Sequence, residues 1–179
     1  LELAARVRAR PGWAVPRASG FMQNFLSPHP VGGRIRRHGE IRTAAGDGRV
    51  GWVDARDIAA AAFALLADPG IEPGGRRDYL LTGPNALSYQ SAAAIITART
   101  GRPVRVVTIG ADEQAANYRA AGMSAEFAAA IAAVEDGIRA GREDQVSTAV
   151  LDLTGRPPRN FAEFVEEHAA EWAYAGLSE

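Results

Sequence analysis

The sequence predicts an α/β fold, in which strands and helices alternate and pack in layers. Three observations predict it. The chain has 179 residues, of which 47% are hydrophobic. Short apolar runs alternate with helical patterns of about 10 to 15 residues, and most of these patterns follow a capping residue. A chain of this length forms one domain with a buried core, and this alternation is typical of layered α/β proteins.

The composition excludes several classes of function. The net charge is −1, which gives no indication of nucleic acid or of an anionic membrane as a partner. There is no cysteine, so disulfides, thiol nucleophiles and thiolate metal sites are excluded. No apolar run approaches the roughly 20 residues that a membrane helix needs, and no leader pattern is present. We therefore expect a cytoplasmic protein.

The first elements are a helix, a strand and a short helical turn. Residues 2–10 predict an amphipathic helix without a cap, which indicates a chain cut or processed from a longer protein. Residues 13–17 predict a strand with an edge or a bulge at Pro16, because proline donates no ladder hydrogen bond. A helical turn follows Ser19 and Gly20. Residues 31–50 are rich in glycine and arginine and predict a loop with one short strand.

The middle of the chain repeats a strand and helix rhythm. Residues 51–57 lead from a strand into a helix over 58–67, and Asp57 is the predicted N-cap. A strand over 78–82 precedes a helix that Ser88 caps and Gly101 ends. A further strand is predicted over 104–109.

Helices dominate the last third of the predicted structure. Asp112 and Ser124 are predicted to cap helices that end near Ala121 and Ala140, and the alanine-dense segment 125–133 is expected to pack closely on a neighbour. Residues 146–153 predict a short strand. Asn160 and Glu163 form a predicted capping box for a helix over 161–174.

Four segments, in this order, resemble the NmrA-like family of atypical short-chain dehydrogenase/reductases. They are "RASGFMQNF" (17–25), "VGWVDARDIAAAAFALLADP" (50–69), "DYLLTGPNALSYQSAAAIITARTGRPVRVV" (78–107) and "LTGRPPRNFAEFVEEH" (153–168). The resemblance implies the C-terminal portion of a Rossmann-like NAD(P)-binding fold with the added helical substrate-binding region of that family. Residues 1–179 would then be a single partial domain that lacks the N-terminal dinucleotide-binding half.

NAD(P)H is the cofactor that the resemblance implies, but the glycine-rich turn that receives its phosphates is not found. Such a turn follows a strand and opens a helix. Gly46 and Gly48 precede a strand instead, so we expect an ordinary loop there. We expect the chain to have no dinucleotide binding and no activity on its own.

The resemblance also suggests a substrate site in the segment 17–25. Here the chain has Arg17-Ala18-Ser19 where the family usually has Arg-Pro-Gly. Phenylalanine and methionine side chains form adaptable apolar linings, and ligands of α/β sheets bind beyond the carboxyl ends of strands. The alternative is that these apolar side chains belong to the core. The predicted substrate-binding residues are Ser19, Gly20, Phe21, Met22 and Asn24.

Other candidate groups favour structural roles. Asp54 and Asp57 could form a carboxylate pair, but a helix cap and a surface pair with Arg56 are favoured. Tyr89 and Tyr118 are interpreted as packing residues, because a chain with no lysine has no Tyr-x-x-x-Lys dyad.

Scattered histidines and clustered arginines give no site either. The histidines His29, His38 and His168 have no metal-binding spacing, so no metal is expected. Residues 34–49 contain five arginines, which are interpreted as a solvated loop, with a phosphate contact as the alternative.

The resemblance leaves three functions open. The first is a fragment, the substrate-facing half, of an NAD(P)H-dependent oxidoreductase, whose parent reduces a small quinone-like or other conjugated carbonyl compound by hydride transfer. The second is a non-catalytic NAD(P)-sensing regulator that acts through a protein partner. The third is a half-protein completed by another chain, because an unpaired strand over 13–17 would expose a raw edge. The expected partners are a small-molecule substrate and either a second copy or a complementing N-terminal segment.

Overall fold

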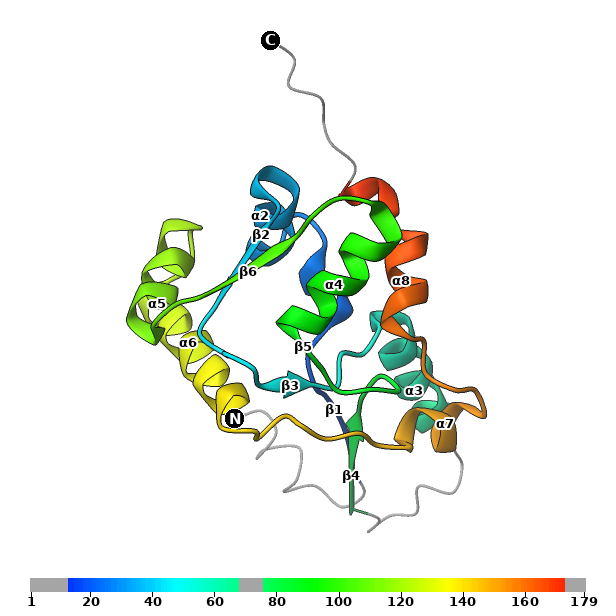
Figure 1. Cartoon of the computed structure of the whole chain (residues 1–179). Helices are drawn as coiled ribbons and strands as arrows, with labels where there is room; N and C mark the ends of the chain where they lie inside the picture. Colours follow the sequence, from blue (N-terminus) through cyan, green and yellow to red (C-terminus); the bar gives the residue numbers. More distant parts are fainter. Residues whose placement is uncertain (1–12, 68–75, 173–179) are drawn as a thin grey trace.

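The computed structural model describes residues 13–67 and 76–172, which form three pairs of strands packed among helices (Figure 1). The predicted helix over residues 2–10 lies outside the described residues. The pair of helices α5 (Ala111–Ala120) and α6 (Ala125–Arg139) lies on one side of the strands. Helix α4 (Tyr89–Thr100) packs against α8 (Phe161–Glu167).

The first strand pair carries the segment that the sequence singled out. Strand β1 (Trp13–Ala18) runs parallel to β4 (Arg76–Leu81) in an unbroken register, so the bulge considered at Pro16 does not occur. Within the described residues β1 pairs with β4 alone, which leaves Pro16 in the edge position that its missing donor favours. Helix α3 (Ala55–Ala67) packs against β1, and α7 (Ala149–Thr154) packs against α3 and β4.

The predicted loop over residues 31–50 is wrong. Helix α2 (Pro30–His38) occupies its first part and leads into β2 (Glu40–Thr43), which pairs in parallel with β6 (Arg105–Thr108). The glycines at 32 and 33 led to the loop prediction, because glycine is unfavourable inside a helix. Gly32 is needed because a Cβ there would lie 2.3 Å from the backbone of Leu26.

The remaining short elements complete the framework. Strand β3 (Arg49–Val50) pairs antiparallel with β5 (Leu87–Ser88). A one-turn 3₁₀ helix, η1, spans Met22–Phe25, and a second, η2, spans Ala169–Glu171. The last predicted helix thus ends as α8 at Glu167.

Three predicted N-caps are confirmed. The side chains of Ser88, Ser124 and Asn160 accept hydrogen bonds from the free backbone N–H groups at the starts of α4, α6 and α8. Gly101 ends α4 in the left-handed conformation, with φ of 70°. The alanine-rich α6 packs on α5, as expected for small side chains.

Three other local predictions are wrong. The predicted strand over 146–153 is helix α7 from Ala149 onward. Asp112 lies in the first turn of α5, and Gly110 takes the cap position. Asp57 lies in the first turn of α3, where Asp54 accepts the hydrogen bond from the backbone N–H of Arg56. An acidic residue is favourable both at the N-cap and in the first turn of a helix. The sequence alone therefore does not show which of these two positions Asp57 or Asp112 occupies.

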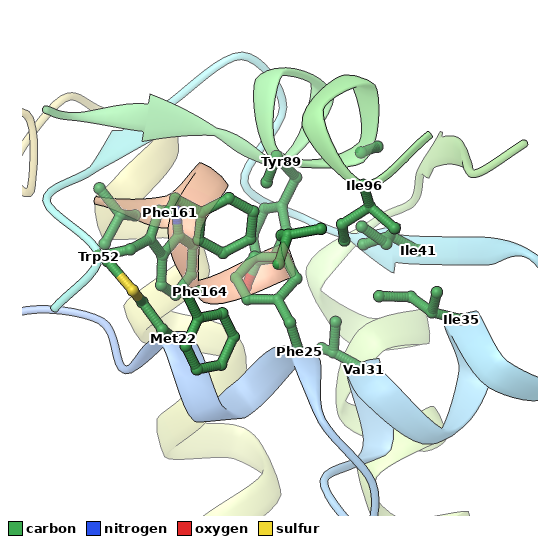
Figure 2. Close-up of a cluster of buried hydrophobic side chains, with 14 of the residues drawn as sticks. Met22, Phe25, Val31, Ile35, Ile41, Trp52, Tyr89, Ile96, Phe161 and Phe164 are labelled. Atoms are coloured by element: carbon green, nitrogen blue, oxygen red, sulfur yellow. The ribbon is translucent and has the colours of Figure 1, made fainter. Parts of the chain in front are cut away.

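The core is an aromatic cluster centred on Phe25, which Figure 2 shows with its neighbours. The Phe25 ring meets Trp52 and Phe161 edge-on at centroid distances of 4.9 and 4.8 Å. Trp172 lies fully buried and donates its indole N–H to the Phe25 carbonyl at 3.0 Å. The cluster thereby joins η1, the β3 region, α4 and α8 into one unit.

A buried carboxylate joins α2, β2 and β6. Glu40 accepts hydrogen bonds from Arg42 at 2.7 Å, from Arg105 at 2.5 Å and from Arg34 at 2.5 Å. These bonds, that from Arg42 foremost, lower the pKa of Glu40 to about 2. Two of the arginines that suggested a solvated loop therefore bind Glu40. Arg49 likewise donates to the Ala86 carbonyl.

Replacing Glu40 with Gln is expected to lower the free energy of unfolding at pH 7 by about 2 kcal/mol. The folded-state pKa of Glu40 lies below its ordinary value of 4.5, so this stabilisation is present above pH 4.5 and is lost as the pH falls toward 2. Urea unfolding at pH 7 and pH 3 should therefore show a smaller difference between parent and variant at pH 3. Glu113→Gln, which removes an exposed partner 3.5 Å from Arg42, is the control and should change little. Equal stability of parent and Glu40→Gln at pH 7 would contradict this role.

Candidate substrate cavity

A cavity of about 510 Å³ lies between the end of β1, the β3 region and helix α6. A volume of this size accommodates a small organic molecule. Most of its lining is apolar, and five aromatic side chains contribute to it. These aromatic residues are Phe21, Trp52, Tyr89, Tyr118 and Phe127.

Backbone hydrogen bonds place the segment after β1 at the cavity. Ser19 donates its backbone N–H to Leu81 at the end of β4. Val53 donates to the Gly20 carbonyl at 2.8 Å and accepts from Met22 at 2.9 Å, which closes a parallel bridge between Phe21 and Val53. The segment therefore begins where the parallel strands β1 and β4 end, the usual place for a ligand in such sheets.

Four of the five predicted substrate residues line the cavity, and Met22 does not. Ser19, Gly20, Phe21 and Asn24 contribute to the lining. Met22 is 1% exposed and points into the core beside Trp52 (Figure 2). The 3₁₀ geometry explains the difference. Residues three apart, such as Met22 and Phe25, lie on one face of η1 and turn toward the core.

Gly20 brings the backbone against the indole ring of Trp52. A Cβ at position 20 would lie 2.4 Å from the Trp52 ring and 2.7 Å from Val50, closer than atoms pack. Trp52 thus forms a wall of the cavity on one side and part of the aromatic core on the other. The ring is fixed by its N–H, which donates to the Leu87 carbonyl at 3.1 Å.

The carboxylate of Glu135, on α6, is 3% exposed and also lines the cavity. Both of its oxygens accept from groups that only donate. Oε2 accepts the backbone N–H of Ala44 at 2.6 Å, and Oε1 accepts the amide N–H of Gln114 at 2.7 Å. The hydroxyls of Thr43 and Tyr118 complete the set at 2.9 and 2.5 Å. Four donors fill the acceptor positions of an ionised carboxylate, so the geometry fits the charged form.

Both tyrosines of the lining are buried, and they do more than fill the core. Burial foremost, with the negative charge of Glu135, raises the pKa of Tyr118 and of Tyr89 above the ordinary value. Their phenol groups therefore stay neutral, and the Tyr118 hydroxyl donates to Glu135. The sequence interpretation of these residues as packing residues missed their place on the cavity wall.

His29 contributes a neutral ring to the same cavity. Burial lowers its pKa below the ordinary value, against a hydrogen bond with the Asn24 backbone and the charge of Glu135. Its Nδ1 accepts the backbone N–H of Val31 at 3.2 Å, at the start of α2. His29 is thus a fixed wall residue at neutral pH.

The edge of the cavity is open and apolar. Phe21, Phe127 and Val134 are 44%, 54% and 53% exposed although they line it. Glu143 also lines the cavity, and its carboxylate accepts a hydrogen bond from the Ser19 hydroxyl at 3.3 Å. Large apolar side chains left in water around a cavity are typical of a binding site.

The acidic residues of the "VDARDIA" segment form hydrogen bonds and ion pairs that connect separate segments of the chain. Asp54 is fully buried, and although burial opposes its ionisation, hydrogen bonds from Arg56 lower its pKa. Gln23 donates to Asp54 and accepts from the backbone N–H of Ala55, so η1 is tied to the start of α3.

A second tie connects this segment to the "TGRPPRNF" segment. Asp57 accepts the backbone N–H of Arg159 at 2.8 Å and pairs with its guanidinium. Arg56 also reaches Glu167 of α8 at 2.6 Å. Asp54 and Asp57 therefore have structural roles, as favoured from the sequence, but the details differ: Asp57 pairs with Arg159 and does not cap α3, and the carboxylate that pairs with Arg56 is buried.

Three places where backbone N–H groups could receive a phosphate are occupied by the protein itself. Gly48 packs against the end of α6, where a Cβ would lie 2.1 Å from the Ile138 carbonyl, so the loop 46–48 has no room for a phosphate. The N–H groups at the starts of α4 and α6 are occupied by Ser88 and Ser124. Among the described ranges, no cluster of three or more acidic or histidine side chains is arranged to bind a metal. The helices described there are also too short or too polar to cross a bilayer.

The homologues of the chain are oxidoreductases of the NmrA-like, NAD(P)-binding reductase type, which confirms the resemblance and the fold class inferred from the sequence. No family model matches the chain.

Individual relatives match most of this chain and about half of their own length. The chain is 41% identical over 167 residues to the uncharacterized oxidoreductase YesF of Bacillus subtilis, which covers 93% of this chain and 57% of that protein. It is 39% identical over 167 residues to the NAD(P)H azoreductase of Xenophilus azovorans, with 91% and 55% covered. The NADPH complex of the quinone oxidoreductase QOR2 of Escherichia coli matches with a TM-score of 0.73 at 26% identity, over 84% of this chain and 51% of that one. The chain thus spans about half the length of the curated relatives that it matches.

Replacing Gly20 with Ala is expected to lower the free energy of unfolding by about 1 to 3 kcal/mol, because the new methyl group must displace Trp52 or Val50. The indole should also become more exposed to water, which a red shift of tryptophan emission would report. Gly110→Ala is the control for an added methyl group, since nothing lies within 4 Å of a Cβ there and φ is −76°; it should leave the emission unchanged and cost no more than about 1 kcal/mol, because alanine is the poorer N-cap. A Gly20→Ala variant with the stability and emission of the parent would contradict the close contact.

Proposed function

We propose that the chain forms the substrate side of an NAD(P)H-dependent reductase whose acceptor is a flat, conjugated carbonyl compound of the quinone type. The observation that supports this most is the aromatic cavity at the ends of β1 and β4. Its position is that of a ligand in an open α/β sheet, and its walls suit a planar ring. The named relatives include an azoreductase and a quinone oxidoreductase, whose acceptors are conjugated compounds.

The lining residues would bind and orient the acceptor. Trp52 is held rigidly between the core and the cavity, so it offers a fixed surface for an aromatic ring. Asn24 lines the cavity, and its side-chain amide has no hydrogen-bond partner among the described residues. It is free to donate to a carbonyl oxygen of the acceptor. The apolar edge at Phe127 and Val134 would exclude water from the bound ring.

The cofactor would be bound mainly by residues beyond the described ones. A reduced nicotinamide supplies the hydride in this class of enzyme. Because the loop 46–48 has no room for a phosphate and side chains cap the starts of α4 and α6, we propose that a complementing segment or chain supplies the dinucleotide site. In this proposal the 179 residues alone bind the acceptor and do not turn it over.

The proposal predicts that the isolated chain binds a neutral naphthoquinone. Isothermal titration should show one site, and Asn24→Ala should weaken binding about fivefold, because one hydrogen bond is lost. Asn85→Ala, which changes an exposed amide away from the cavity, should bind as the parent does.

Two further measurements test the division into halves. NADPH should not bind the chain alone, and NADPH oxidation by the quinone should require a protein that includes the dinucleotide-binding half. Stoichiometric binding of NADPH to these 179 residues would contradict the proposal. Absence of naphthoquinone binding would contradict the assigned substrate cavity. Cofactor binding by the longer protein without turnover would favour a regulatory sensor.

A further inference from the structure

The charged side chains that line the cavity are all acidic. Of its described lining residues, Glu135 and Glu143 carry carboxylates, and none is an arginine. The chain has no lysine. His29, the remaining group that titrates near neutral pH, is held neutral by burial. A cavity with this lining has a negative potential that no group of the described lining cancels.

Glu143 lines the cavity and is partly exposed to solvent. Its carboxylate accepts the Ser19 hydroxyl at 3.3 Å and forms no ion pair with a described residue. The nearby arginines are directed elsewhere. Arg49 lies 3.7 Å from Asp144, and Arg139 lies 2.7 Å from Asp136. The guanidinium of Arg142 folds back over Gly137.

Glu135 adds a second negative charge deeper in the cavity. Its four hydrogen-bond donors are all neutral groups, so they stabilise the carboxylate without cancelling its charge. Unlike Glu143, it has its acceptor positions filled by protein groups. It therefore acts on a ligand through its field, while Glu143 is able to contact the ligand directly.

Resting on the proposed function, we infer that Glu143 is a specificity-determining residue, and that the cavity selects neutral or positively charged conjugated acceptors and rejects anionic ones. Charges a few ångströms apart near a protein surface interact by an amount that changes affinity several-fold. Anions are rejected because the same Coulomb interaction with the carboxylates is repulsive for a negative ligand. An anion would also lose part of its hydration on entry, with no cation in the described lining to replace it.

A matched set of ligands tests this inference on the chain itself. The set is one naphthoquinone in three forms: unsubstituted, with a trimethylammonium group, and with a sulfonate group at the same position. The cationic form should bind about tenfold more tightly than the anionic form at low salt. That ratio should shrink as ionic strength rises, because the opening is exposed to solvent.

The variants separate the charge from the shape of the site. Glu143→Gln keeps an acceptor for Ser19 and removes the charge, so the ratio of cation to anion affinity should fall to about threefold or less. Asp144→Asn is the matched control: it removes the neighbouring charge, which pairs with Arg49 outside the lining, and should leave the ratio unchanged.

The outcomes distinguish this inference from the function on which it rests. Equal affinities for the cationic and anionic forms, with normal binding of the neutral form, would overturn the charge selection alone. A ratio that Glu143→Gln leaves unchanged would overturn the role of Glu143. Failure of all three forms to bind would overturn the proposed function together with the inference.

Discussion

The edge-to-face contact between Phe25 and Trp52, 4.9 Å between ring centroids, determines where the cavity lies. Phe25 is completely buried at the centre of the aromatic cluster, so its position is set by packing from several elements. Trp52 rests on it with one side and borders the cavity with the other. Gly20 allows the chain leaving β1 to touch the same ring. The cavity floor is therefore the outer surface of the core, and its geometry is as firmly fixed as the core packing.

The opposite wall depends on a polar contact. Helix α6 is joined to the loop after β2 by Glu135, whose carboxylate would be costly to bury without partners. Four donors from two separate segments, the end of β2 and helix α5, satisfy it, so the hydrogen bonds position α5, α6 and the loop relative to one another. The site thus has an apolar floor at Trp52, which side-chain packing holds in place. Its opposite wall, helix α6, is held in place by hydrogen bonds, which depend on direction.

Local signals in the sequence predicted local structure well. Ser88, Ser124 and Asn160 cap helices because a side-chain oxygen can reach N–H groups only a few residues away. Prediction failed where distant contacts decide: α2 tolerates two glycines because the chain of Leu26 lies against one of them. The order of family motifs indicated the reductase class, and four of the five predicted substrate residues line the cavity, Met22 being the exception. Glu135 and Glu143 were missed, because their partners are 17 to 124 residues away.

The two sides of the cavity differ in how freely they can change. Phe127 and Val134 of α6 face the ligand space while more than half of each side chain is in water, so few packing contacts constrain them. Trp52, in contrast, is shared with the buried centre of the molecule. New acceptor shapes are therefore accessible through mutation of one helix surface at little cost in folding free energy. Because of this asymmetry, the range of bound compounds can change through substitutions on the exposed face of α6 while the rest of the fold stays the same.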